Sequence, residues 1–156
     1  MFVNILKIFF LSSSPIIEIR GALPLALAVY RLPFFWAFLI CFLGNIFPVI
    51  FLLFILEKLF FYFSKFPFFE KILKWYFKKT NDKFSPYFKK WQKLALLIFV
   101  GLPFPLTGAW TGSVAAVLMG FNKKEAFILI SGGVVISGLI VSLLFVFGQL
   151  TLNFFY

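Results

Sequence analysis

Residues 12–24 read Ser12-Ser13-Ser14-Pro15-Ile16-Ile17-Glu18-Ile19-Arg20-Gly21-Ala22-Leu23-Pro24, a charged, proline-containing break inside an apolar stretch. Lipid disfavours both buried charge and irregular backbone, so such a break is tolerated only where protein or a water-filled cavity shields it. Of the five acidic residues, only Glu18 lies well inside an otherwise apolar segment. This stretch therefore predicts a local departure from a plain membrane helix and a functional site at the same place.

The composition around the break is that of an integral membrane protein. Apolar residues make up 63% of the 156 residues and charged residues only 13%, against about 25% in a typical soluble domain. A chain of this length favours one membrane domain over residues 1–156 rather than two domains. A second copy of the chain is a candidate partner, because so short a protein encloses little interior of its own.

Several functions are excluded by the residues that the chain lacks. It has no histidine, and its one cysteine, Cys41, lies in an apolar run, which leaves neither a disulfide nor a cluster for a transition metal. No nucleophile–base pair and no phosphate-binding loop is recognisable, so we expect no enzyme activity, no catalytic residues and no cofactor.

The net charge of +10 comes mainly from one region, residues 57–93, which holds ten lysines and three acidic residues. The lysines alternate with aromatic residues at helical spacing, the pattern of basic amphipathic helices lying at a membrane interface. Such a region favours the cytoplasmic side of an inner (plasma) membrane, and nucleic acid is not expected as a partner. An entrance for an anionic substrate is the alternative interpretation of the same residues.

Four apolar segments follow from the hydropathy. Residues 34–56 and 126–150 carry no charge and reach the length of about 20 apolar residues that a span needs. Residues 1–31 are interrupted by the break quoted above, and residues 94–121 are interrupted by the proline-containing stretch 102–108. Each broken segment precedes an intact one, so the same layout occurs twice.

The repeated layout predicts an internal duplication, of the kind from which many transporters are built. A shift of 89 positions also places Ala37 on Ala126 and Gly44 on Gly133. We therefore predict an all-α integral membrane protein with two inverted repeats, each a re-entrant helical hairpin plus a transmembrane helix, joined by the basic amphipathic interfacial helices of residues 57–93. This topology places Lys123 on the cytoplasmic face, whereas the alternative of four complete spans places it outside.

Glu18 and Arg20 are the first candidates for the site. Residues two apart on a helix do not face each other, so we expect the two side chains to pair on an extended elbow, which Pro15 and Gly21 favour. Glu18 would then respond to protons or coordinate a cation, with Arg20 as its counter-charge or as a contact for an anion. A buried ion pair that only locks the hairpin is the structural alternative.

Small residues after Arg20 predict a slim half-helix through Pro24, whose N-terminal amides favour an anion. The second break offers hydroxyl groups on Thr107 and Thr111 and backbone carbonyls that its prolines leave free. The complete candidate transport site, with Asn45 added as the polar exception in the first span, is Glu18, Arg20, Pro15, Gly21, Pro24, Asn45, Pro103, Pro105, Thr107, Gly108 and Thr111.

Two stretches carry a resemblance to a known family. They are Ser14-Pro15-Ile16-Ile17-Glu18-Ile19-Arg20-Gly21-Ala22-Leu23-Pro24-Leu25-Ala26 and Pro105-Leu106-Thr107-Gly108-Ala109-Trp110-Thr111-Gly112, and they resemble the hallmark stretches of the small multi-drug export protein family. That family is similar in turn to the DedA/VTT superfamily, in which two re-entrant hairpins each pack with a span in inverted repeat. The resemblance implies that Glu18 and Arg20 take part in proton-coupled movement, although the second hairpin lacks the arginines of DedA proteins.

The sequence therefore predicts a membrane transporter that exports small amphipathic molecules, coupled to protons or ions. A DedA-like flippase or scramblase for lipid or polyprenyl phosphate is the first alternative, and a membrane scaffold that transports nothing is the second. The expected partners are membrane lipid and a small amphipathic or anionic substrate.

Overall fold

The computed structural model describes residues 2–63 and 86–155, in which all regular secondary structure is helical. The helices are α1 (Phe2–Ser13), α2 (Glu18–Ala28), α3 (Phe34–Phe63), α5 (Pro86–Gly101), α6 (Ala109–Leu118) and α7 (Lys123–Phe155). Two segments, Phe34–Leu56 in α3 and Lys123–Thr151 in α7, are long and apolar enough to cross a membrane. The all-helical class and the first predicted span are thus as expected for a membrane protein.

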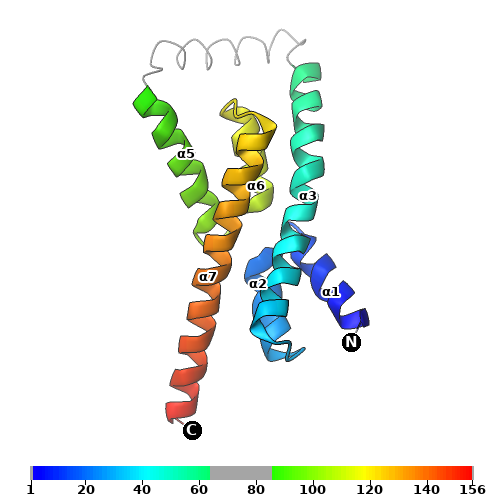
Figure 1. Cartoon of the computed structure of the whole chain (residues 1–156), viewed down its shortest axis with the longest axis vertical. Coiled ribbons are helices and arrows are strands. Elements are labelled where there is room, and N and C mark those ends of the chain that lie inside the picture. Colours follow the sequence, from blue (N-terminus) through cyan, green and yellow to red (C-terminus); the bar gives the residue numbers. More distant parts are fainter. Residues whose placement is uncertain (1, 64–85, 156) are drawn as a thin grey trace.

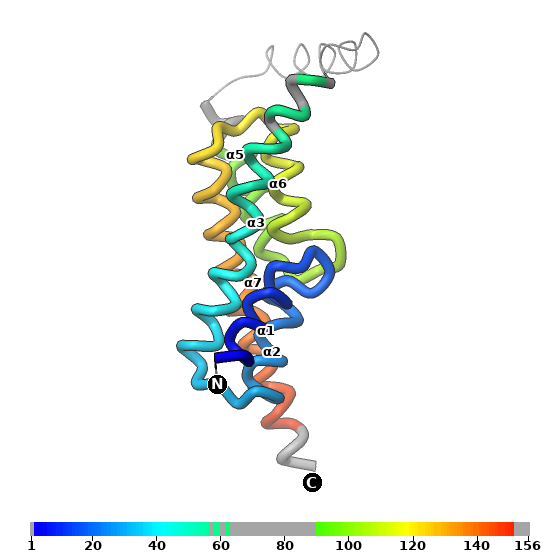
Figure 2. The backbone as a smooth tube through the Cα atoms, turned by 90° about the vertical axis from the view of Figure 1, so that its right-hand side faces the viewer, coloured from blue at the N-terminus to red at the C-terminus, as the bar shows by residue number. Residues whose placement is uncertain are grey.

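The helices form two hairpins against two long helices (Figure 1). Helices α3 and α7 run side by side in opposite directions along the long axis of the molecule. The α1–α2 hairpin occupies one half of that length and the α5–α6 hairpin the other half. Their turns, the dark blue and yellow-green bends of Figure 2, lie next to each other at mid-height. Each hairpin therefore begins and ends at one end of the molecule.

The packing partners of the two halves correspond. Helix α1 packs on α3 as α5 packs on α7, and each hairpin also holds its own two helices together. The second helix of each hairpin also contacts the long helix of the other half of the chain, since α2 contacts α7 and α6 contacts α3. The N-terminal and C-terminal halves of the chain are therefore packed against each other through these contacts.

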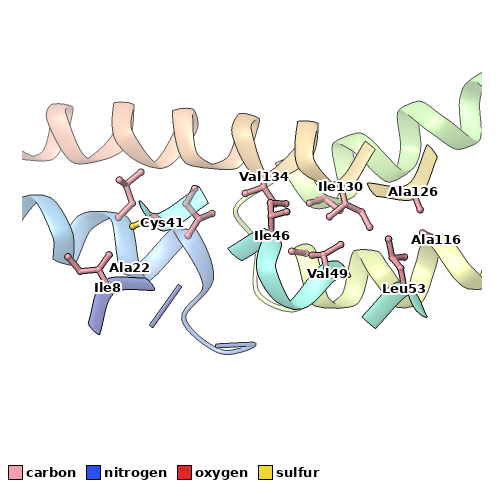
Figure 3. Close-up of a cluster of buried hydrophobic side chains, with 14 of the residues drawn as sticks. Ile8, Ala22, Cys41, Ile46, Val49, Leu53, Ala116, Ala126, Ile130 and Val134 are labelled. Carbon is pink, nitrogen blue, oxygen red and sulfur yellow. The ribbon is translucent and has the colours of Figure 1, made fainter. Parts of the chain in front are cut away.

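The core between these helices consists mainly of small and branched apolar side chains (Figure 3). In α3 the buried residues include Ala37, Cys41, Val49 and Leu53, which recur every four residues or a multiple of four and so follow a strip that winds gradually around the helix. The α1–α3 contact depends on Gly44, since a Cβ there would come within 3.1 Å of the Ser12 Cβ. Large apolar side chains instead cover the outer surfaces of α3 and α7.

Some expected boundaries differ from the structure. Helix α7 begins at Lys123 rather than at residue 126, and α5 begins at Pro86 rather than at residue 94. Lysine is a good helix former, so the charges that limit an apolar segment do not end the helix. The predicted interfacial helices fall partly on α3, which continues to Phe63, and partly on α5; residues 64–85 lie outside the described part of the chain.

Candidate functional site

The turns of the two hairpins enclose an open cleft of about 850 Å³. Its walls are mostly apolar, and Ile16 and Leu106, at the tips of the two turns, are 91% and 87% exposed. Eight of the eleven predicted site residues line the cleft, namely Pro15, Glu18, Arg20, Gly21, Pro103, Pro105, Thr107 and Thr111. The structure thus brings the two breaks, which are about ninety positions apart in sequence, to one place.

Glu18 is the first residue of α2 and reaches across the junction to the other hairpin. It is only 6% exposed, and its backbone is in the left-handed region with φ of 50°. Its Oε1 accepts a hydrogen bond from the backbone N–H of Trp110 at 3.4 Å. The carboxylate therefore lies at the N-terminus of α6, where unpaired amides and the helix dipole favour negative charge.

Gly108 makes this approach possible. It precedes α6 as its N-cap residue with φ of 155°, a conformation that favours glycine. A Cβ at this position would lie 2.6 Å from both the Cδ and the Oε1 of Glu18. Gly108 thus leaves the space that the Glu18 carboxyl fills, which is why it is buried beneath that group and does not line the cleft itself.

Arg20 makes the corresponding contact at the end of α5. Its Nη2 donates to the Val100 carbonyl at 3.3 Å, its Nη1 donates to the Phe104 carbonyl, and its Nε donates to Ser137 Oγ at 3.2 Å. The Val100 carbonyl lacks its usual helical partner because the Phe104 N–H donates to Leu102 instead. Arg20 therefore caps the carboxyl end of α5 and ties it to α7.

Trp110, in the second hairpin, makes a corresponding contact with the first hairpin. Its indole Nε1 donates to the carbonyl of Ser13, the last residue of α1, at 3.1 Å. Each hairpin therefore supplies a side chain that caps the first helix of the other hairpin. Sequence reasoning did not select Trp110, although an indole N–H in an apolar segment usually requires a hydrogen-bond partner when it is buried.

The expected extended elbow at residues 18–20 is wrong. Helical hydrogen bonding starts just before it, with the Gly21 N–H donating to the Ile17 carbonyl at 3.0 Å. Glu18 and Arg20 still approach each other, with Arg20 Nε 4.0 Å from Glu18 Oε2. The left-handed backbone at Glu18 changes the direction of its side chain, so the pair forms without the two residues sharing an extended face.

The hydroxyl groups of the second break are used within the break. Thr107 Oγ1 donates to the carbonyls of Leu102 and Phe104, both at 2.8 Å, and Thr111 Oγ1 donates to Gly108 at 3.4 Å. The remaining predicted residues lie away from the cleft. Pro24 is inside α2, and Asn45 is buried in α3 with 1% of its surface exposed.

The two long apolar helices, with broken hairpins that meet at the Glu18–Arg20 pair, are consistent with a small helical membrane protein. Residues 18–140 match the model of the family described as "Putative small multi-drug export protein". The chain belongs to this family, and the family together with the apolar helices indicates a membrane location. No curated protein and no solved structure gives a significant match, and the similarity to DedA proteins stays a prediction.

Proposed function

We propose that the protein is a transporter of small amphipathic molecules and that the cleft between the two hairpins is its substrate site. The observation that carries this proposal is the pair of buried Glu18 and partly buried Arg20 beside a cleft with mostly apolar walls. Ionisable side chains within membrane-embedded segments usually belong to substrate or ion pathways. Apolar walls with a few polar groups are also the usual lining of a small-molecule site.

In this proposal α1–α2 and α5–α6 are re-entrant hairpins, and α3 and α7 are complete spans. Helices α1, α2 and α6 have 12, 11 and 10 residues, or about 15–18 Å at the usual helical rise. That is about half of a hydrocarbon layer of about 30 Å, so hairpins entering from opposite sides would meet near its centre. The corresponding contacts of the two halves support inverted repeats.

The orientation of the protein is part of the same proposal. Lys90, Lys93, Lys123 and Lys124 belong to the starts of α5 and α7, which lie at the same end of the molecule. Basic residues favour the cytoplasmic side. We therefore place this end, with the basic region 57–93, in the cytoplasm and the protein in the inner membrane.

The caps at the junction suggest how the cleft works. Within a membrane, broken helix ends need partners because water is absent, and here each hairpin provides them for the other. Separation of the hairpins would free these amides and carbonyls for the polar part of a substrate. Of the described carboxylates only Glu18 lines the cleft, so coupling to a proton or an ion would act through it.

A lipid flippase or scramblase is the second candidate. The exposed tips of the hairpins, Ile16 and Leu106, favour it, because they border the cleft at mid-height and would open it toward lipid tails. Under this candidate, proteoliposomes should move fluorescent phospholipid between leaflets faster than empty liposomes do. Equal rates would reject it.

Dye movement in proteoliposomes tests the first candidate. The wild-type protein should move rhodamine 6G or 8-anilinonaphthalene-1-sulfonate faster than protein-free liposomes, and Glu18→Gln and Arg20→Gln should abolish the difference. The matched controls Glu125→Gln and Arg31→Gln, which change the same residue types outside the cleft, should move dye as the wild type does. Wild-type rates in the Glu18 and Arg20 variants would refute the site. Loss of folded protein in both variants, without a separate effect on rate, would favour the scaffold.

A further inference from the structure

Asn45 is a polar side chain in the centre of the molecule without a hydrogen bond. It is 1% exposed, and within the described part of the chain neither its Oδ1 nor its Nδ2 has a partner. An unpaired carboxamide is costly in an apolar interior. A buried polar group without a partner is typical of a functional or strained site.

The position of Asn45 follows from the packing of α3 against α6. Leu53 of α3 and Ala116 of α6 belong to the same core cluster (Figure 3). The two helices are in contact and run in the same direction (Figure 1). Asn45 is eight residues before Leu53, and the start of α6, at Gly108 and Ala109, is seven to eight residues before Ala116. Gly44, next to Asn45, packs on Ser12 near the end of α1. Asn45 therefore lies at the level of the hairpin junction, where the Glu18 carboxylate meets the N-terminus of α6.

We propose that Asn45 is a second binding position for the Glu18 side chain. In the structure the Glu18 carboxylate occupies the amides at the start of α6. When Glu18 takes up one proton, its O–H can donate to Asn45 Oδ1 while Asn45 Nδ2–H donates to its carbonyl oxygen, so that one partner satisfies both atoms. The amides of α6 are then free for another acceptor.

The charges identify that acceptor as an anionic group, an inference that rests on the proposed transport function. Arg20 is the more exposed member of the pair, with 17% of its side chain accessible against 8% for Glu18. Helix amides and a guanidinium together favour a carboxylate, sulfonate or phosphate head group. Its negative charge replaces the charge that Glu18 loses, so one proton is bound for each anionic head group.

The groups around Glu18 are compatible with this exchange. On α2, the helix that carries Glu18, the other charged residue is Arg20. Of the described residues near the junction, α6 contributes the indole of Trp110, α7 contributes Ser137, and α3 contributes Cys41 one turn before Asn45. Lys7 of α1 is more than one turn before the end of that helix. The proton on Glu18 therefore has Arg20 as its neighbouring charge.

Asn45→Leu separates this role from a structural one. Removing an unpaired buried carboxamide should leave the melting temperature of the protein at or above the wild-type value, while movement of 8-anilinonaphthalene-1-sulfonate falls at least tenfold. Ser131→Ala is the matched control, because it removes another buried group without a partner, and it should leave both quantities unchanged. A large fall in melting temperature for Asn45→Leu, or an unchanged rate, would overturn the proposal.

A binding measurement tests the anion site without transport. Glu18→Gln imitates the protonated carboxyl, so in nanodiscs it should bind 8-anilinonaphthalene-1-sulfonate several-fold more tightly than the wild type and should not gain affinity for the cation rhodamine 6G. Weaker binding of the anion, or an equal gain for both dyes, would contradict the inference. If the wild type moved no dye, the transport proposal would fail while this binding result would still decide the role of Glu18.

Discussion

The carboxylate of Glu18 in α2 accepts a hydrogen bond from the backbone N–H of Trp110 in α6, although the two residues are 92 positions apart. In return, the Trp110 indole donates to Ser13, at the end of the helix that precedes Glu18. The charged break of the first hairpin thus provides a cap for the second hairpin and receives one from it. This exchange explains why charged side chains and irregular backbone occur together. The polar side chains provide hydrogen-bond partners for helix ends that water does not reach.

Gly108→Ala should disrupt this relationship most directly. The added methyl group would occupy the space of the Glu18 carboxyl, at a φ that disfavours alanine. We expect the free energy of unfolding to fall by about 2–4 kcal/mol, since backbone strain and loss of a charged hydrogen bond both contribute. Denaturant unfolding in detergent measures the change.

Gly148→Ala is the matched control, because beyond its own stretch of helix no atom of the described residues lies within 4 Å of its added Cβ. It should be neutral or stabilise α7 by up to about 1 kcal/mol through helix propensity. Equal effects of the two substitutions would show that Gly108 has no special relation to Glu18.

Arg20→Lys tests whether the shape of the guanidinium matters in addition to its charge. Lysine has one charged nitrogen and cannot reproduce the planar arrangement by which Arg20 reaches Val100, Phe104 and Ser137 together. We expect a loss of about 1–3 kcal/mol in the free energy of unfolding. The same replacement at Arg31, which is exposed, should have little effect. If the Arg20→Lys variant were as stable as the wild type, Arg20 would act only as a counter-charge.

The sequence was informative about the fold where hydropathy and helix length act alone. The first span was predicted to begin at residue 34, and α3 begins there, although the helix continues to Phe63. The second break, 102–108, was located correctly as an irregular segment, because proline and glycine act on the local backbone. In the first break only residues 14–17 are irregular, since α2 already begins at Glu18. The starts of α5 and α7 were predicted several residues too late. Lysines can form the first turns of a helix, so the helix is longer than the apolar segment from which it was predicted.

The candidate site was harder to predict, because its decisive contacts cross between the hairpins. Local reasoning paired Glu18 with Arg20, whereas the closest partners of both side chains belong to the other half of the chain. Backbone carbonyls and amides carry no residue-specific signal, so the roles of the Val100 carbonyl and the Trp110 N–H could not be predicted from the residue types. Asn45 was selected as a polar residue in an apolar span, but its burial depends on tertiary packing.

Trp110→Phe should weaken the reverse contact while retaining an aromatic ring. The carbonyl of Ser13 would lose its donor in a half-buried site, and the free energy of unfolding should fall by about 0.5–1.5 kcal/mol. Trp36→Phe is the matched control, since Trp36 is exposed at the start of α3. Thermal unfolding of both variants measures the difference, and no difference between them would mean that the indole N–H contributes nothing to joining the hairpins.

Cysteine labelling of intact cells decides between opposed hairpins and four complete spans. With the buried Cys41 replaced by alanine, single cysteines can be introduced at Arg31, Lys93 and Lys123. The ion pair between Lys93 and Glu125 joins the starts of α5 and α7, so cysteines at 93 and 123 should share one accessibility. We expect a membrane-impermeant maleimide to label position 31 from outside and to reach 93 and 123 only after permeabilisation. Labelling of 123 but not of 93 from outside would exclude the proposed topology.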